Sequence, residues 1–226
     1  DGFKINHIVY TLVEGENLLT MSKSTGLSVI EFSTAFDQLK PDIVLVVADR
    51  YETLAAAVAA SYMNIVLAHT QGGEVTGSID ESVRHATTKL AHIHFPASLK
   101  AKKNIIKMGE NPKKVHLVGC PSLDLIKRNQ LKIDNKFKKQ YSRFGVGELE
   151  INFNKPYIVV LQHPVTTEYE KIKENIDQTI NAIIKVDQQV VWLWPNVDAG
   201  SDVLSKRIRR LREEVKPKHI RWQNSF

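Results

Sequence analysis

The sequence predicts an α/β protein built on parallel β-sheets. Short runs that are apolar throughout alternate with longer segments of helical periodicity, which is typical of strands that helices cover on both faces. Polar residues follow several of these runs directly. The expected strands are residues 43–49, 65–71, 92–97, 115–120, 157–163, 190–195 and 220–223. The expected helices are residues 51–63, 79–90, 99–108, 168–186 and 202–215.

A basic, turn-rich stretch interrupts this alternation between residues 127 and 155. It has no strong period, so we interpret it as the passage between two domains. We expect an N-terminal domain over residues 1–130, a connector over residues 131–155, and the first part of a second domain over residues 156–226. The chain opens at Asp1 rather than at a methionine, and we expect both domains to be incomplete in it.

Composition narrows the classes of function. Apolar residues make up 42% and charged residues 25% of the chain, as in ordinary soluble proteins, and the apolar runs are too short to cross a membrane. The net charge of +6 is concentrated in residues 127–139 and 206–218, which we interpret as solvated surface rather than a nucleic-acid site. Cys120 is the single cysteine; it excludes an intrachain disulfide, fits a reducing, cytoplasmic location and is expected to be buried.

The most informative segment joins a glycine turn to a helix. Ser78 and Glu81 have the spacing of a capping box, which predicts a helix that begins at Ile79. Asp80 and Arg84 are one helical turn apart, so we expect them to pair, either as an ordinary surface ion pair or as part of a site. The apolar stripe expected to face the core consists of Ile79, Val83, Ala86 and Leu90.

Polar residues also gather where the expected strands end. Ligands of open α/β sheets bind beyond the carboxyl ends of the strands, and a helix N-terminus after a glycine turn favours anions. We therefore expect a phosphorylated, hydroxyl-rich ligand in a cleft between the two domains. The residues at these ends are Asp49, Arg50, Gln71, Gly72, Gly73, Glu74, His163 and Asn196.

Each of these residues also has a simpler structural interpretation. Asp49 could cap the helix at residues 51–63, His163 could be an ordinary histidine in a turn, and Glu74 could be a solvated carboxylate. His92 and His94 alternate on one strand, but no third ligand has fitting spacing, so we expect no metal site.

Several strings in the chain resemble one known family. The most specific are Ile79-Asp80-Glu81-Ser82-Val83-Arg84-His85-Ala86 and His163-Pro164-Val165-Thr166-Thr167. Further matches, in the same order as in the family, are residues 48–52, 72–74, 89–92, 118–122 and 195–201. By these strings the chain resembles the hydrolysing UDP-N-acetylglucosamine (UDP-GlcNAc) 2-epimerases, of the bacterial sialic-acid pathway and of the animal bifunctional enzyme.

The resemblance implies two Rossmann-like domains in a glycosyltransferase-B-like (GT-B-like) arrangement, assembled as a dimer or a tetramer. It implies conversion of UDP-GlcNAc and water to N-acetylmannosamine (ManNAc) and UDP, without metal or nicotinamide. Loss of UDP makes C1 electron-poor, so a carboxylate can remove the C2 proton and leave a glycal, to which water adds. This chemistry needs a base, an acid, and cations or dipoles around the diphosphate.

Carried over residue by residue, the resemblance implies a set of roles. Asp49 or Asp80 is the acid/base, with Arg84 orienting Asp80. His163 contacts the phosphates, and Glu74 supports the sugar hydroxyls. The residues expected near the nucleotide or in close approach to the substrate are Arg50, Asn196, Gly72 and Gly73.

Gln71 departs from the family pattern, because many relatives carry glutamate there, and an amide cannot take a proton at neutral pH. A catalytically weak nucleotide-sugar-binding protein is therefore one alternative, and a GT-B-type glycosyltransferase is another. A sugar with a further substituent at C4 or C6, such as a diacetamido sugar, is an open alternative to UDP-GlcNAc.

Overall fold

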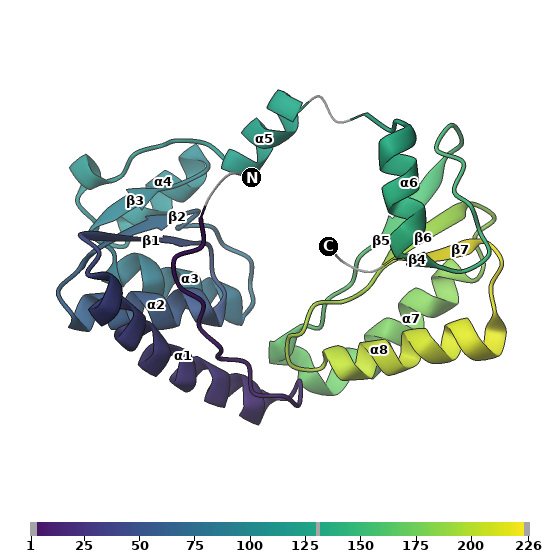
Figure 1. Ribbon diagram of the computed structural model, residues 1–226, viewed down its shortest axis with the longest axis horizontal. Coiled ribbons are helices and arrows are strands. Elements are labelled where there is room, and N and C mark those ends of the chain that lie inside the picture. The colour runs from purple at the N-terminus through teal and green to yellow at the C-terminus, as the bar shows by residue number, and fades with distance from the viewer. Residues whose placement is uncertain (1–3, 130–131, 224–226) are drawn as a thin grey trace. The chain divides into compact units, whose positions relative to one another are not determined.

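The computed structural model describes residues 4–129 and 132–223. The chain forms two compact units: unit 1 comprises residues 1–14 and 19–129, and unit 2 comprises residues 15–18 and 130–226. Each unit is an α/β assembly with its own sheet (Figure 1), as predicted. No helix in the described part of the chain is both long and apolar enough to span a membrane.

The sheet of unit 1 is parallel, with the strand order β1-β2-β3. These strands are β1 (Ile43–Val47), β2 (Val66–Thr70) and β3 (Ile93–Phe95). The helices that connect and follow them are α2 (Tyr51–Tyr62), α3 (Ile79–Leu90) and α4 (Leu99–Lys107). The predicted elements in this region are confirmed to within two residues at each end.

The core of unit 1 lies between β1, β2, α2 and the long helix α1 (Leu18–Leu39). Val44 and Val46 are buried there against a row of alanines on α2. We expected helices over both faces of each strand, but the other side of β1 is open: Ile43, Leu45 and Val47 are 56%, 59% and 55% exposed.

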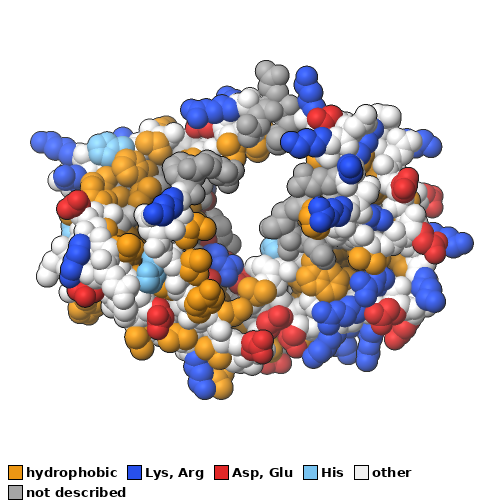
Figure 2. All heavy atoms as spheres, viewed as in Figure 1, with side chains coloured by type: hydrophobic (Ala, Val, Ile, Leu, Met, Phe, Trp, Pro, Cys, Tyr) orange, Lys and Arg blue, Asp and Glu red, His pale blue; other side chains and the backbone are white. Residues whose placement is uncertain are grey.

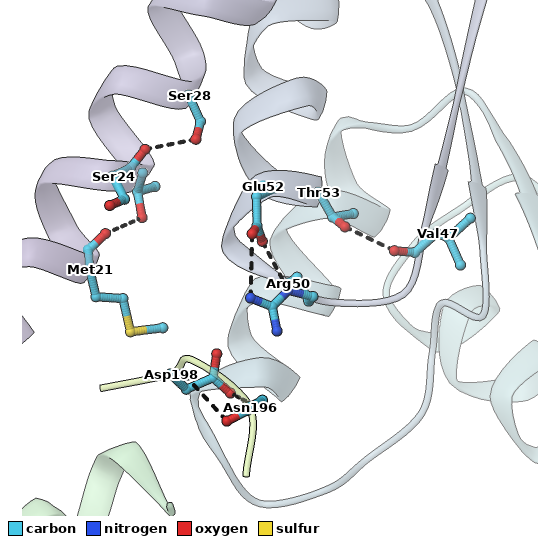
Figure 3. Close-up of polar contacts among 10 residues, drawn as sticks. Met21, Ser24, Ser28, Val47, Arg50, Glu52, Thr53, Asn196 and Asp198 are labelled. Atoms are coloured by element: carbon cyan, nitrogen blue, oxygen red, sulfur yellow. Dashed lines mark hydrogen bonds and ion pairs between the residues drawn. The ribbon is translucent and has the colours of Figure 1, made fainter. Parts of the chain in front are cut away.

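Helix α1 was not predicted, and its buried residues explain why. They include Ser24 and Ser28, so the inward side of the helix is not an apolar stripe. The hydroxyl of Ser28 donates to the Ser24 carbonyl at 2.7 Å, and Thr25 donates to Met21 at 2.9 Å (Figure 3). The Ser24 hydroxyl accepts from the Val13 N–H at 2.9 Å, so the hydroxyls of both buried serines have hydrogen-bond partners.

Residues 115–120 do not form the expected strand. After the short 3₁₀ helix η1 (Pro112–Lys114), the chain runs beside β3 with one parallel bridge, between His94 and Val115. Beyond the bridge, the N–H groups of His116 and Val118 donate to the carbonyls of His94 and Pro96 at 2.8 and 3.3 Å. Pro96 has no N–H to return a bond, so no regular strand forms. Cys120 is half-buried rather than buried, and it precedes helix α5 (Pro121–Asn129), which was not predicted.

The sheet of unit 2 has the order β4-β7-β6-β5. Its parallel strands are β5 (Tyr157–Val160), β6 (Gln189–Leu193) and β7 (Ile220–Gln223). Strand β7 has the predicted bounds and β6 lies within two residues of them, whereas β5 ends three residues earlier than predicted. The short β4 (Gly145–Val146) pairs with β7 in the antiparallel sense. The helices are α6 (Asn135–Phe144), η2 (Thr166–Lys171), α7 (Ile172–Ile183), α8 (Ser201–Arg210) and the π-helical η3 (Leu211–Val215).

The segment expected to be a connector contributes to unit 2. Within residues 131–155, α6 places Tyr141 edge-on to Phe153, and Arg221 of β7 donates to the carbonyls of Ser142 and Gly147 at 2.9 and 2.8 Å. These aromatic and arginine contacts order the segment as part of unit 2, although its basic, turn-rich composition is typical of a connector.

Helices α7 and α8 lie side by side against this sheet (Figure 1) and form its core with it. Trp192 and Trp222 are buried there and Trp194 packs against this core. The basic residues Lys206, Arg209 and Arg210 are exposed on α8. Figure 2 shows that Lys and Arg side chains gather on part of the surface, and their role as solvated surface stays a prediction.

Candidate active site

The carboxyl ends of β1 and β2 bring two predicted site residues to one edge of unit 1. Val47 is in register with Thr70, so Asp49 and Gln71 follow neighbouring strands. Both ends turn sharply, since Ala48 and Gln71 each have a φ of 59°, in the left-handed region that non-glycine residues rarely adopt. The backbone is thus held in an uncommon conformation at Gln71 and at the residue directly before Asp49.

Asp49 forms an ion pair with Arg84 of α3. A second guanidinium nitrogen of Arg84 donates to the Glu74 carbonyl at 2.9 Å. The Arg84 side chain is only 6% exposed and that of Asp49 20%, and burial lowers the pKa of the guanidinium. Arg84 therefore joins α3, the end of β1 and the glycine turn.

This pairing corrects two predictions. Arg84 does not orient Asp80, because Asp80 is exposed and accepts a hydrogen bond from the Ser78 hydroxyl at 3.3 Å. Asp49 does not cap α2 either, since the N-cap residue of that helix is Arg50. Arg84 thus pairs with Asp49, which is distant in sequence, and not with Asp80, which is one helical turn away. Asp49 is the less exposed of the two carboxylates, and an ion pair in a less exposed position is screened less by water.

Helix α3 begins at Ile79 as predicted, but its cap differs. The Ser78 side chain makes no capping bond, and Glu81 instead accepts from the N–H groups of Thr76 and Gly77 at 2.9 and 2.7 Å. Those two bonds lower the pKa of Glu81, and the bond from the Gly77 N–H contributes most.

The apolar stripe expected to bury α3 is confirmed only at its end, where the partly buried Leu90 packs against the core of unit 1. Ile79 is 41% exposed, and Ala86 is exposed. The buried residues of the helix are Arg84, Thr87 and Thr88. A charged and hydroxyl-bearing side of α3 thus faces the interior, where its polar groups meet β1, β2 and the glycine turn.

The glycines of the turn are required by packing within unit 1. A Cβ on Gly72 would lie 2.8 Å from Oγ1 of Thr88 and 2.9 Å from Nδ1 of His69. Gly73 has a φ of +81°, and a Cβ there would lie 2.4 Å from the Ala101 carbonyl oxygen of α4. Both glycines therefore allow the protein's own segments to approach closely, and this contact sets the position of the turn.

Gln71 is half-buried, and its amide nitrogen lies 3.6 Å from the sulfur of Cys120. Its backbone N–H donates to the Phe95 carbonyl at 3.0 Å, which holds the start of the turn on the sheet. Gln71 is thus at the expected edge, but its side chain approaches Cys120 rather than the Asp49–Arg84 pair.

His69 is a site neighbour that sequence reasoning missed. It lies on β2, is 1% exposed, and burial lowers its pKa to about 4, so it is neutral near pH 7. Nε2 lies 2.8 Å from the Ala48 carbonyl and Nδ1 lies 3.1 Å from the Thr88 hydroxyl. A histidine inside an otherwise apolar strand, two residues before the predicted site position Gln71, is the signal that could have identified it.

Arg50 lies next to Asp49 at the start of α2. Its guanidinium donates to both carboxylate oxygens of Glu52, at 3.1 and 3.3 Å, and Thr53 donates to the Val47 carbonyl at 2.9 Å (Figure 3). These contacts hold the first turn of α2 against the end of β1.

In unit 2, the exits of β5 and β6 bring together the other predicted residues. The Asn196 N–H donates to Nδ1 of His163 at 3.2 Å. Nδ1 is therefore an acceptor, and Nε2, on an exposed side chain, is the ring nitrogen that can donate. The Asn196 side chain donates to Asp198 and accepts from Ser201 at 3.2 Å (Figure 3 shows the bond to Asp198).

Asn196 also lines a cavity of about 160 Å³ in unit 2, together with Glu16, Trp194 and Arg209. That volume is well below the roughly 300–1,000 Å³ of typical ligand pockets. The cavity can accept part of a ligand rather than a whole nucleotide sugar.

The two strand histidines have structural partners. His92 accepts from the Leu67 N–H at 3.1 Å, and buried His94 lies 3.4 Å from Glu110. Among residues 4–129 and 132–223, no group of three potential metal ligands comes together.

Two Rossmann-like α/β units with polar residues at their strand ends define the GT-B-like class of protein. The chain belongs to the UDP-N-acetylglucosamine 2-epimerase family, whose model matches residues 1–223. It is 34% identical over 92% of its length to the UDP-N,N'-diacetylbacillosamine 2-epimerase (hydrolyzing) of Legionella pneumophila, and 30% identical over 97% to the polysialic acid biosynthesis protein P7 of Escherichia coli. It spans 53% and 55% of those proteins.

The fold agrees with solved structures. The UDP-GlcNAc 2-epimerase of Neisseria meningitidis bound to UDP-GlcNAc superposes with a TM-score of 0.70 at 23% identity. The alignment covers 91% of this chain and 55% of that one. The chain thus spans about half the length of the relatives it matches, and at this identity the likeness concerns the fold.

Proposed function

We propose that the protein is a hydrolysing nucleotide-sugar 2-epimerase that converts UDP-GlcNAc and water to ManNAc and UDP. The observation that carries the proposal is the Asp49–Arg84 pair at the end of β1, joined through Arg84 to the turn that begins α3. It offers a carboxylate of fixed orientation at the edge of the sheet where α/β proteins bind ligands. Membership of the epimerase family supports the reaction class.

The reaction has two stages in this proposal. The C1–O bond to the diphosphate breaks and its electron pair leaves with UDP, while a carboxylate takes the C2 proton, so a C1=C2 double bond forms. Water then adds its oxygen to C1, and a proton returns to C2 from the opposite face. The product is ManNAc, and no oxidant or reductant is consumed.

We assign removal of the C2 proton to Asp49, whose orientation Arg84 fixes, and return of the proton to Asp80. Arg84 also supplies positive charge as the diphosphate departs. His163 donates its Nε2–H to a phosphate oxygen, because Asn196 occupies Nδ1. Gln71 and Glu74 hydrogen-bond the sugar, and Arg50 and Asn196 lie near the nucleotide.

A second candidate substrate is a UDP-2,4-diacetamido sugar. The relatives named for UDP- or GDP/UDP-N,N'-diacetylbacillosamine are 34% and 33% identical to the chain, whereas the Neisseria meningitidis UDP-GlcNAc 2-epimerase is 27% identical. This difference favours testing both sugars with the same mechanism and the same residues.

Proton NMR of the whole protein in heavy water tests the proposal with each sugar separately. We expect free UDP and the 2-epimer carrying deuterium at C2, since the proton that returns comes from solvent. Transfer that needs an added acceptor would instead indicate a glycosyltransferase. Thermal stabilisation by the nucleotide sugar without UDP release would indicate a binding protein.

A further inference from the structure

Three segments of unit 1 must keep their relative positions if Asp49 and Arg84 are to act together. They are the end of β1, the glycine turn and α3. The ion pair itself joins two of them, the end of β1 and α3. A second connection, away from the reacting groups, is formed by His69 and Thr88.

The hydrogen-bond directions of this connection follow from the partners. The Ala48 carbonyl can only accept, so Nε2 of His69 carries the proton and donates to it at 2.8 Å. Nδ1 is then an acceptor, and the Thr88 hydroxyl donates to it at 3.1 Å. The chain of bonds therefore runs from α3 through β2 to the residue directly before Asp49.

Both ends of this connection adjoin the ion pair. Ala48 precedes Asp49, and its own N–H donates to the Thr70 carbonyl at 3.1 Å, so both of its backbone polar groups are bonded to β2. Thr88 lies one turn after Arg84 on the buried side of α3. Gly72 packs directly against the bond between Nδ1 and the hydroxyl, which includes the glycine turn in the same contact.

We propose that His69 is a positioning residue for the reaction: through the Ala48 carbonyl and the Thr88 hydroxyl it fixes where the Asp49 carboxylate lies relative to Arg84. This inference rests on the proposed function. It assigns His69 no contact with substrate.

Helix α3 offers a matched pair of variants. Thr87 and Thr88 are adjacent and both are 0% exposed. The Thr87 hydroxyl has no hydrogen-bond partner among the described residues, whereas the Thr88 hydroxyl bonds His69. Thr88→Val and Thr87→Val therefore make the same chemical change at equal burial, and only the first removes the bond.

We expect Thr88→Val to lower kcat of the whole protein by about tenfold or more while KM changes little, because small misplacements of reacting groups slow the chemical step. Thr87→Val should have the same kcat as the unmodified protein. Thr88→Ser retains the hydroxyl and should also have a kcat close to that of the unmodified protein. Rates are measured per folded molecule, well below the melting temperature.

Equal rates for the two valine variants, with an active unmodified protein, would overturn the positioning role and leave the proposed function intact. An unmodified protein that releases no UDP from either sugar would overturn the function, and the positioning role with it. Long-range ¹H–¹⁵N NMR of His69 provides an independent check: a proton on Nδ1 instead of Nε2 would contradict the bond directions.

Discussion

The guanidinium of Arg84 donates to the carboxylate of Asp49, 35 positions earlier in the chain. The nearer carboxylate, Asp80, is bonded to the Ser78 hydroxyl instead. Arg84 also holds the Glu74 carbonyl, so one side chain makes two bonds in different directions. The fork shape of a guanidinium suits this task, and a point charge does not.

Arg84→Lys should therefore reduce kcat by about 10²-fold, because lysine cannot hold Asp49 and Glu74 at once. Steady-state UDP release measures the effect. Arg207→Lys is a matched control, since Arg207 forms a half-exposed pair with Asp177 at 2.5 Å and should keep the normal rate. Near-normal turnover of Arg84→Lys would contradict the importance of the pair.

Asp49→Asn should lower kcat by about 10²- to 10⁴-fold, the usual contribution of a general base. Asparagine preserves the shape of the side chain and an oxygen that can accept from Arg84, so the loss reports the missing basicity. Exchange of the C2 proton with heavy water is measured beside turnover. If Asp80→Asn stops this exchange and Asp49→Asn does not, the base is Asp80.

Gln71→Glu should leave kcat close to that of the unmodified protein, because Gln71 approaches Cys120 rather than the Asp49–Arg84 pair. The pre-steady-state rate of UDP release checks this. A rise of about 10²-fold or more would move the role of base to position 71.

Gly73→Ala should destabilise the protein by about 2–4 kcal/mol, since it adds both a left-handed φ and a clash with α4. Gly77→Ala separates the two effects. Gly77 has a φ of +75°, but a Cβ there meets nothing within 4 Å, whereas at Gly73 it would lie 2.4 Å from the Ala101 oxygen. Urea unfolding should show a loss of only about 1 kcal/mol for Gly77→Ala. Equal losses would rule out the clash.

The pH dependence of stability should reflect His69. Its pKa is lowered from 6.5 to about 4 in the folded protein. Above pH 6.5 both the folded and unfolded states are neutral at this residue, so stability is fully present there. As pH falls from 6.5 towards 4, the unfolded state binds the proton first, and the free energy of unfolding decreases by up to about 1.4 kcal/mol per pH unit.

Urea unfolding between pH 7 and pH 5 measures this slope. His69→Gln, which retains an N–H for the Ala48 carbonyl, should flatten it. His94, whose pKa burial also lowers, adds a slope of the same sign that remains in the variant. An unchanged slope in His69→Gln would mean that His69 is charged in the folded state.

Local sequence patterns predicted most of the fold, because the apolar periodicity and the end signals of those helices and strands lie within their own residues. The bounds of α3 and β7 agree with the sequence prediction at both ends. Helix α1 escaped prediction because its buried side includes Ser24 and Ser28 rather than an apolar stripe. Helix α6 escaped it because Tyr141 is buried against Phe137, Phe153 and Arg221.

In the site too, local patterns predicted some features, whereas others depend on residues that are distant in the sequence. The strand ends placed Asp49 and Gln71 at one edge, as expected from parallel topology alone. The partner of Arg84 could not be found from spacing, because i, i+4 geometry describes only what lies on one helix. The role of Gly72 likewise depends on His69 and Thr88, which are distant from each other in sequence.

The connection through His69 joins a neutral ring to a carbonyl and a hydroxyl. Dissolved ions weaken attraction between charges but have little effect on buried neutral hydrogen bonds. Ionic strength should consequently change how readily an anionic nucleotide sugar is captured, and leave unaltered the hydrogen bonds that hold the backbone directly before Asp49. Substrate capture and the backbone position at the end of β1 would then respond independently to the salt around the protein.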